Sequence, residues 1–191
     1  MALVANGLAG NKNKGEREKN DFYPTPPHAT ESLLNRVNFE GSVWEPACGD
    51  GAICKVLEEK EYKVYATDKY DRGYGVYDID FLTWDWTKTF NHRPANIITN
   101  PPYKIAQEFV ERSLECTTGK VAMLLKLNFL ESARRYEMFN NTPLKHVLVF
   151  SKRLNFYEGT LEGNKRSGVL AFAWYVWEHG YEGQPQIDWI L

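Results

Sequence analysis

Residues 42–51, which read Ser-Val-Trp-Glu-Pro-Ala-Cys-Gly-Asp-Gly, set the expected architecture of this chain. Ser42 to Glu45 predicts a short strand, and residues 52–60 have the character of a helix. The glycines between them allow a tight turn and a close approach of the backbone to a ligand. An acid at the strand end, Glu45, suits a ligand with an ammonium group. Taken alone, such a turn is equally an ordinary connection between a strand and a helix.

A second acid strengthens the ligand interpretation. Asp68 lies 19 residues beyond Gly49, at the end of the predicted strand 62–67. A carboxylate there can accept hydrogen bonds from two ribose hydroxyls. Since the turn lacks Gly-Lys-Ser/Thr, the pattern favours an adenosyl amino acid over a nucleotide phosphate. Asp80 ends the predicted strand 75–79 and can accept from an adenine amine, while Phe81 fits either the adenine face or the core.

The tetrapeptide Asn100-Pro101-Pro102-Tyr103 carries the most specific chemistry in the chain and follows the predicted strand 96–99. An exocyclic adenine amine is a poor nucleophile because its lone pair is delocalised into the ring. The Asn100 side-chain carbonyl and a neighbouring proline carbonyl can each accept one of its N–H groups, and the Tyr103 ring can stack on the base. Two prolines hold these acceptors stiffly. Asn-Pro and Pro-Pro also occur in ordinary turns.

Taken together, these segments resemble the amino-methylating, S-adenosylmethionine-dependent DNA methyltransferases, which modify N6 of adenine. The resemblance covers about residues 21–177, and its motif order is like that of the group whose target-recognition region comes last. The matching segments are Tyr23-Pro24-Thr25-Pro26, Glu45 to Gly51, Asp68, Asp80-Phe81-Leu82 and Asn100 to Tyr103.

The resemblance implies a Rossmann-like α/β fold of the class I methyltransferases, with a seven-stranded, mostly parallel sheet whose last strand is antiparallel. It implies that S-adenosylmethionine is the cofactor, that Asp68 holds its ribose, and that Asp80 and Phe81 hold its adenine. A flipped target adenine would bind at the catalytic residues Asn100, Pro101, Pro102 and Tyr103. The methionine end would contact Tyr23, Thr25, Pro26, Glu45, Ala47, Gly49 and Gly51.

The remaining elements complete an alternation of strands and helices, which is typical of an open α/β sheet with its site at the carboxyl ends of the strands. Thr25 is the predicted N-cap of the first helix. Helices are predicted over 26–34, 52–60, 104–116 and 132–139, and strands over 42–45, 62–67, 75–79, 96–99, 121–125, 144–150 and 169–177.

Target recognition has little room in this chain. Residues 1–20 are predicted to be a flexible arm, and residues 21–191 a single catalytic domain without a separate recognition domain. Selectivity would then depend on loops, and the candidates are 126–135 and 152–168. Phe156 fits a ring that packs on the target base, or a hydrophobic anchor of its loop. The substrate-binding candidates are Lys152, Arg153, Asn155, Phe156, Lys165 and Arg166.

Composition sets the remaining limits. The 191 residues are 43% hydrophobic and 25% charged, as in a soluble globular protein, and neither a signal peptide nor a membrane span is evident, so a cytoplasmic location is expected. A net charge of -2 argues against coating nucleic acid by charge alone. Three cysteines without a Cys-x-x-Cys pair predict neither a disulfide framework nor a metal site. Trp174, Trp177 and Trp189 fit a homodimer face, although the core is favoured for the first two.

Other functions remain open at this stage. Similar Asn-Pro-Pro-Tyr enzymes methylate a protein glutamine amide, and RNA adenine presents the same amine. DNA is favoured over a protein substrate because only about 20 ordered residues precede the glycine turn, too few for a peptide-docking domain. An inactive methyltransferase-like binding protein is the alternative outside catalysis.

Overall fold

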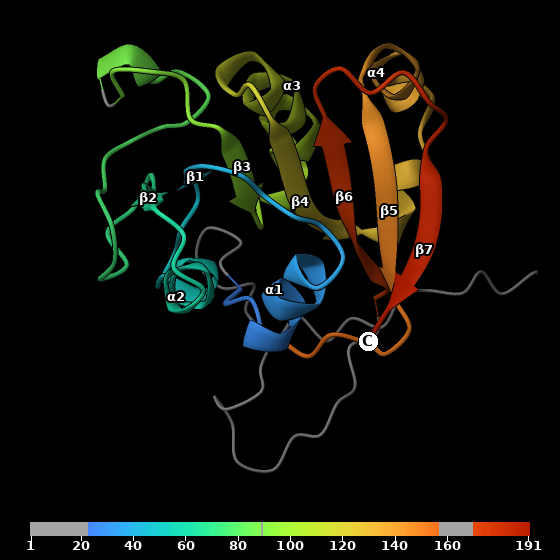
Figure 1. The fold of residues 1–191 in the computed structure, drawn as a ribbon, viewed down its shortest axis with the longest axis horizontal. Coiled ribbons are helices and arrows are strands. Elements are labelled where there is room, and N and C mark those ends of the chain that lie inside the picture. The colour runs from blue at the N-terminus through green and yellow to red at the C-terminus, as the bar shows by residue number, and fades with distance from the viewer. Residues whose placement is uncertain (1–22, 89, 157–169) are drawn as a thin grey trace, which may run out of the picture.

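The computed structural model describes residues 23–88, 90–156 and 170–191 (Figure 1). The predicted arm over 1–20 lies outside these residues. So do two predicted substrate contacts, Lys165 and Arg166, and the first residue of the strand predicted over 169–177.

The described chain is built around one seven-stranded sheet with the strand order β2-β1-β3-β4-β6-β5-β7. This confirms the predicted α/β class and the number of strands. The strands are β1 (Val43–Glu45), β2 (Val64–Ala66), β3 (Asn96–Thr99), β4 (Lys120–Lys126), β5 (Leu144–Phe150), β6 (Phe172–Glu178) and β7 (Gln186–Ile190).

All strand pairs are parallel except those made by β6, which runs antiparallel to β4 and β5 on either side. Its arrowhead points away from those of β3 and β7 in Figure 1. The predicted strand 169–177 is therefore the antiparallel one, as expected. It is not the last strand, because β7 follows it and pairs in parallel with β5.

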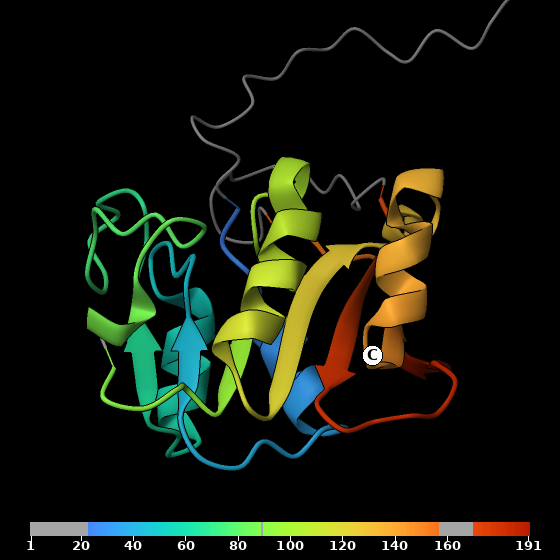
Figure 2. The same cartoon turned by 90° about the horizontal axis from the view of Figure 1, so that it is seen from above.

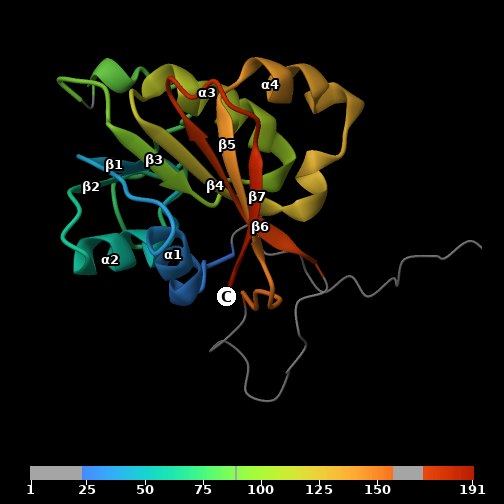
Figure 3. The same cartoon turned by 45° about the vertical axis from the view of Figure 1, so that its right-hand side comes forward.

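Helices cover both faces of the sheet, as Figures 2 and 3 show. One face packs against α1 and α2 through residues such as Leu33 and Ile53, and the other against α3 and α4 through residues such as Phe109 and Met138. The helices are α1 (Pro27–Leu34), α2 (Ala52–Glu59), α3 (Ala106–Cys116) and α4 (Tyr136–Asn141). None in the described ranges is both long and apolar enough to cross a bilayer.

The centre of the sheet is apolar on both faces, because β4 and β6 are covered from two sides. β4 is buried from Val121 to Leu125, and β6 from Phe172 to Trp177. The predicted core positions of Trp174 and Trp177 are confirmed, since both are 0% exposed. Trp174 donates its indole N–H to the carbonyl of Ala29 at 2.8 Å, which ties α1 to the sheet and satisfies a buried donor.

One predicted strand was wrong and one strand was missed. Residues 75–79 make one isolated parallel bridge, Thr67 to Val76, instead of a strand. Gly73, Gly75 and Asp78 all have positive φ there, which breaks extended pairing, and Val76 and Tyr77 are exposed. β7 was not predicted, because its sequence Gln-Ile-Asp-Trp-Ile forms an exposed edge strand with only Ile190 buried.

The ends of two helices also differ from prediction. Residues 132–139 form a short 3-10 turn over Ala133–Arg135, followed by α4. Thr25 is not the N-cap of α1, because Pro26 takes that position without a side-chain cap. The Thr25 hydroxyl instead accepts a hydrogen bond from Asn100.

Candidate active site

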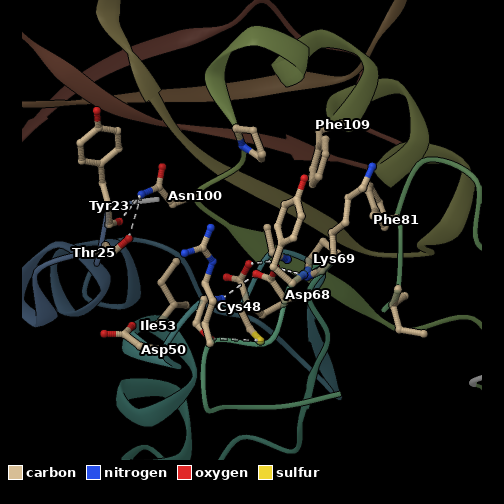
Figure 4. A pocket seen from close by; sticks show the side chains of 18 of the residues that line it. Tyr23, Thr25, Cys48, Asp50, Ile53, Asp68, Lys69, Phe81, Asn100 and Phe109 are labelled. Carbon is tan, nitrogen blue, oxygen red and sulfur yellow. Dashed lines mark hydrogen bonds between the residues drawn. The ribbon is translucent and has the colours of Figure 1, made fainter. Parts of the chain in front are cut away.

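A cavity of about 560 Å³ lies where β1, β2 and β3 end, at the carboxyl edge of the parallel strands (Figure 4). This edge is where open α/β sheets bind ligands. Asn100 lines the cavity together with the glycine turn. Ten of the predicted residues line it: Tyr23, Thr25, Glu45, Ala47, Gly49, Asp68, Asp80, Phe81, Asn100 and Pro102.

The Asp68 carboxylate joins the glycine turn to the end of β2. Its Oδ2 accepts the backbone N–H of Gly49 at 2.9 Å, and its Oδ1 accepts that of Tyr70 at 2.8 Å. Asp68 is 7% exposed and lines the cavity. Each carboxylate oxygen can accept a further hydrogen bond, so Asp68 is able to hold two hydroxyl groups of a ligand while it fixes the turn.

Glu45 is a buried acid that lacks a full set of partners. Its Oε1 accepts the N–H of Ala47 at 3.1 Å, whereas Oε2 completes no hydrogen bond of normal geometry with the described residues, and neither does the hydroxyl of Thr99. Burial raises the pKa of this carboxyl to about 8, and the nearby Thr99 hydroxyl and the Ala47 N–H only partly offset that rise. A cationic ligand group in the cavity would satisfy Oε2 and stabilise the ionised form.

At the far end of the cavity, Asp80 pairs with Lys69. The Lys69 ammonium lies 2.7 Å from Asp80 Oδ2, while Asp80 Oδ1 accepts the N–H of Leu82 at 3.2 Å. Phe81 lines the cavity and is also 2% exposed, with its ring centroid 5.1 Å from that of Trp44 and 4.8 Å from that of Phe109. Phe81 therefore belongs to the core and also forms part of the cavity wall.

The Asn100 amide is held in one orientation. Its Nδ2 donates to the main-chain carbonyl of Tyr23 at 3.3 Å and to the hydroxyl of Thr25 at 3.1 Å, as the dashed lines in Figure 4 show. Because a carbonyl can only accept, the nitrogen must face Tyr23, and Oδ1 is the atom left to accept from a ligand. The three residues come from segments about 75 positions apart in the chain, a link that local sequence patterns do not contain.

Tyr103 lies beside the cavity and does not line it. Its ring centroid is 5.8 Å from that of Phe172, and the Lys126 ammonium lies 4.7 Å from its centre. Phe156 continues this aromatic group, with its centroid 4.9 Å from Phe172 and 6.3 Å from Tyr23. The structure thus brings Phe156 and Tyr103 onto a common ring, Phe172, although 53 positions separate them in the sequence.

Several predicted residues do not line the cavity. Pro26 and Pro101 are buried, and Gly51 packs beneath the Tyr74 ring, where an added Cβ would lie 2.5 Å from that ring. Lys152, Arg153 and Asn155 also lie outside the lining, on the segment after β5. Fourteen lining residues were not among the predicted site residues: Pro24, Pro46, Cys48, Asp50, Ala52, Ile53, Lys69, Tyr70, Arg72, Ile79, Leu82, Lys104, Ile105 and Phe109.

The geometry limits which groups can act as nucleophiles or bases. Burial raises the pKa of the Cys48 thiol to about 12, with the charges of Glu45 and Asp68 adding to the effect, so this cavity residue stays protonated at neutral pH. None of the four histidines, all within the described ranges, lines the cavity. No group of three or more potential metal ligands occurs among the described residues.

No family model and no curated protein matches the sequence. Solved structures do match the fold. The modification subunit ascribed to a type I restriction enzyme of Vibrio vulnificus YJ016 is 14% identical with a TM-score of 0.60, over 92% of this chain and 48% of that one. This chain therefore spans about half the length of that subunit.

Two further matches are methyltransferases by description. One, described as an RNA methyltransferase of Pyrococcus horikoshii, is 15% identical with a TM-score of 0.59, over 83% of this chain and 87% of that one. The other, magnesium protoporphyrin IX methyltransferase of Synechocystis PCC 6803 with bound S-adenosylmethionine, is 11% identical with a TM-score of 0.54, over 80% and 78%. The chain has the class I methyltransferase fold.

Proposed function

We propose that this protein transfers the methyl group of S-adenosylmethionine to the N6 amine of adenine in DNA. The observation that carries the proposal is the fixed Asn100 amide, which presents its oxygen in the same cavity as Gly49 and Asp68. An acceptor for an amine N–H therefore lies beside a site suited to an adenosyl amino acid.

The residues of the cavity fit the cofactor by chemistry. Glu45 has a buried carboxylate oxygen without a hydrogen-bond partner among the described residues, which suits an ammonium group. Asp68 would hold the ribose hydroxyls and Asp80 the adenine amine, with Lys69 moving away from Asp80 or sharing it. When bound, the cofactor would supply an electrophilic methyl group: the N6–carbon bond would form as the carbon–sulfur bond breaks, with a neutral thioether as the leaving group.

The chain's own residues make the amine reactive by accepting its N–H groups. Asn100 Oδ1 would accept one of them. A neighbouring proline carbonyl, of Pro101 or Pro102, would accept the second. Pro102 lines the cavity, and its oxygen keeps one lone pair while it accepts the N–H of Ile105 at 3.1 Å. These acceptors strengthen as positive charge develops on N6, which favours the transition state over the ground state. The surplus proton passes to water, consistent with a lining that contains no histidine.

The test is methyl transfer from labelled S-adenosylmethionine to duplex DNA, RNA and a glutamine-containing peptide in parallel. We expect label in DNA, located at N6 of adenine by nucleoside analysis. Asn100→Ala should lower transfer by at least 100-fold, because one missing hydrogen-bond acceptor costs about that much in comparable sites. Cofactor affinity should fall far less than transfer, because the direct contact that is lost is to the amine, and the lost bonds to Tyr23 and Thr25 affect the cofactor only through those two residues.

Asn140→Ala is the matched control, because Asn140 is exposed on α4 and, among the described residues, its side chain bonds its own helix at the Tyr136 carbonyl. Its transfer rate should equal that of the parent. If the label appears in RNA or peptide and not in DNA, that polymer is the substrate and the proposal of DNA is wrong. Undiminished transfer by Asn100→Ala would remove Asn100 from the mechanism.

A further inference from the structure

Lys126 is the last residue of β4 and lies next to the proposed target site. Its ammonium is 4.7 Å from the centre of the Tyr103 ring, and Tyr103 ends the tetrapeptide that begins at Asn100. Within the described ranges the Lys126 side chain forms no ion pair or hydrogen bond. Its described contact is the one with the Tyr103 ring.

Three other cations lie along the same edge of the sheet. Lys104 follows Tyr103 and lines the cavity, while Lys152 and Arg153 come just after β5. The strand order places β6 alone between β4 and β5, so the ends of β4 and β5 lie about 10 Å apart at ordinary strand spacing. That interval is close to the reach of one or two steps of an extended nucleotide chain.

Some cations elsewhere in the described chain pair with acids. At the opposite end of β4, Lys120 lies 3.9 Å from Glu178, which also pairs with Lys145 at 3.0 Å. Arg134 pairs with Glu108 at 2.9 Å. No carboxylate among the described residues pairs with Lys104, Lys126, Lys152 or Arg153, which leaves their charges available to a ligand. Other described cations, such as Lys60 and Lys88, are also unpaired, so it is the position of these four beside the target site that counts.

The cavity itself has the opposite character on its cofactor side. Four acids line it there, Glu45, Asp50, Asp68 and Asp80, against two cations, Lys69 and Arg72. Acids therefore outnumber cations towards the glycine turn, whereas the named side chains towards the ends of β4 and β5 are cations. A basic row beside an acidic cavity fits a polyanionic substrate better than a peptide amide.

We propose that Lys126, with Lys104, Lys152 and Arg153, binds the backbone phosphates next to the target base. This inference rests on the proposed function and assigns the substrate's phosphodiester chain to one sheet edge. The contact with Tyr103 adds a consequence: an ammonium and a stacked base cannot occupy the same face of one ring. Lys126 must leave that ring face before a base can stack on it, and its flexible stem allows it to reach a phosphate instead.

The test measures the affinity of the full chain for an adenine-containing oligonucleotide at several salt concentrations. Each lost phosphate contact lowers the slope of log K against log salt by about 0.7 for single strands and 0.9 for duplexes. Lys126→Gln should show that loss, together with a several-fold weaker affinity at low salt. Lys126→Arg, which keeps the charge, should retain the parental slope.

Lys120→Gln is the matched control, since it removes the same charge from the other end of the same strand and leaves Glu178 its Lys145 partner. Its slope should equal that of the parent. Equal slopes for Lys126→Gln and Lys120→Gln, with DNA bound by both, would overturn the phosphate site and leave the proposed function standing.

Cofactor binding separates the two proposals further. All variants should bind S-adenosylmethionine as the parent does, because Lys126 does not line the cavity. If the parent binds the cofactor but neither DNA nor RNA oligonucleotides at low salt, the nucleic-acid function fails, and the phosphate site with it. If the parent binds RNA and not DNA, and Lys126→Gln lowers the salt slope for RNA, the phosphate site stands. The proposed substrate then becomes RNA instead of DNA.

Discussion

At the scale of single residues, Glu45 shows how burial determines the chemistry of a carboxyl. Its pKa rises to about 8 in the folded protein, from 4.5 for an ordinary glutamate, mainly because the charged form is desolvated. Between those two values the folded state keeps a proton that the unfolded chain releases. The free energy of unfolding is therefore highest, as far as Glu45 is concerned, below about pH 4.5, where both states carry the proton. This contribution is lost as pH rises through about 8, where the folded state also releases it.

We therefore expect a pH-dependent difference between the parent and Glu45→Gln. Without the ligand, the free energy of unfolding of the parent should fall with rising pH by on the order of 1 kcal/mol per unit between pH 5 and 7, relative to the variant. Denaturant titration at each pH measures it. Glu59→Gln, on the exposed end of α2, should run parallel to the parent. Parallel curves for Glu45→Gln as well would show that this carboxyl ionises normally.

Asp68 combines a structural task with the proposed contact to ribose. Asp68→Ala removes the acceptor of the Gly49 and Tyr70 N–H groups as well as that of the ligand. We expect affinity for S-adenosylmethionine to fall by at least 10-fold in calorimetry, since hydrogen bonds to a charged group contribute about 1.5–3 kcal/mol. Asp71→Ala is the control, because Asp71 is exposed and accepts the nearby Gly73 N–H at 3.0 Å. Equal affinities for the two variants would reject the role of Asp68.

The sequence predicted these residues better than it predicted their partners. Glu45 ends one strand, Asp68 and Asn100 follow two others, and the sheet brings these strand ends together. The sequence does not show that Thr25 accepts a hydrogen bond from Asn100, because helix capping was an equally good local use of its hydroxyl. Lys69 was missed for the same reason, since its pairing with Asp80 depends on how two loops fold.

At the scale of secondary structure, the turn into α2 depends on glycine for two separate reasons. Gly51 has φ +83°, and a Cβ there would also lie 2.5 Å from the Tyr74 ring. Gly73 has nearly the same φ, +81°, with nothing within 4 Å of an added Cβ. The pair therefore separates backbone strain from steric conflict.

Alanine at each position should measure the two effects. Gly73→Ala should lower the free energy of unfolding by about 1–2 kcal/mol, the usual cost of a left-handed non-glycine residue. Gly51→Ala should cost clearly more, because the Tyr74 ring must also move. Denaturant unfolding of both variants makes the comparison, and equal losses would mean that the ring yields without cost.

The strands show the limit of sequence patterns. β4 and β6 were predicted because continuous apolar runs are typical of strands covered on both faces. β7 has no such signature, since it lies at an edge and Ile187 and Trp189 are 57% and 62% exposed. The segment 75–79 has suitable residue types, yet the positive φ angles around it come from turn geometry that residue preference alone does not predict.

At the scale of the whole molecule, cofactor binding should stabilise the folded state. A ligand at 100 times its dissociation constant adds about 2.7 kcal/mol, which raises the unfolding temperature by roughly 5–10 °C in a chain of this size. We expect S-adenosylmethionine to give such a shift in calorimetric melting. Adenosine at the same concentration should give far less, because it has no ammonium group for Glu45. Equal shifts would mean that the cavity does not recognise the methionine end.

The position of β6 between β4 and β5 has a consequence for synthesis on the ribosome. β4 and β5 are both synthesised before β6. These two long apolar strands therefore have no partner between them until residues 172–178 have been made. A nascent chain stalled before Phe172 would expose the edges of β4 and β5, and such edges promote aggregation. Truncation ahead of β6 should therefore yield insoluble material and not a smaller folded fragment.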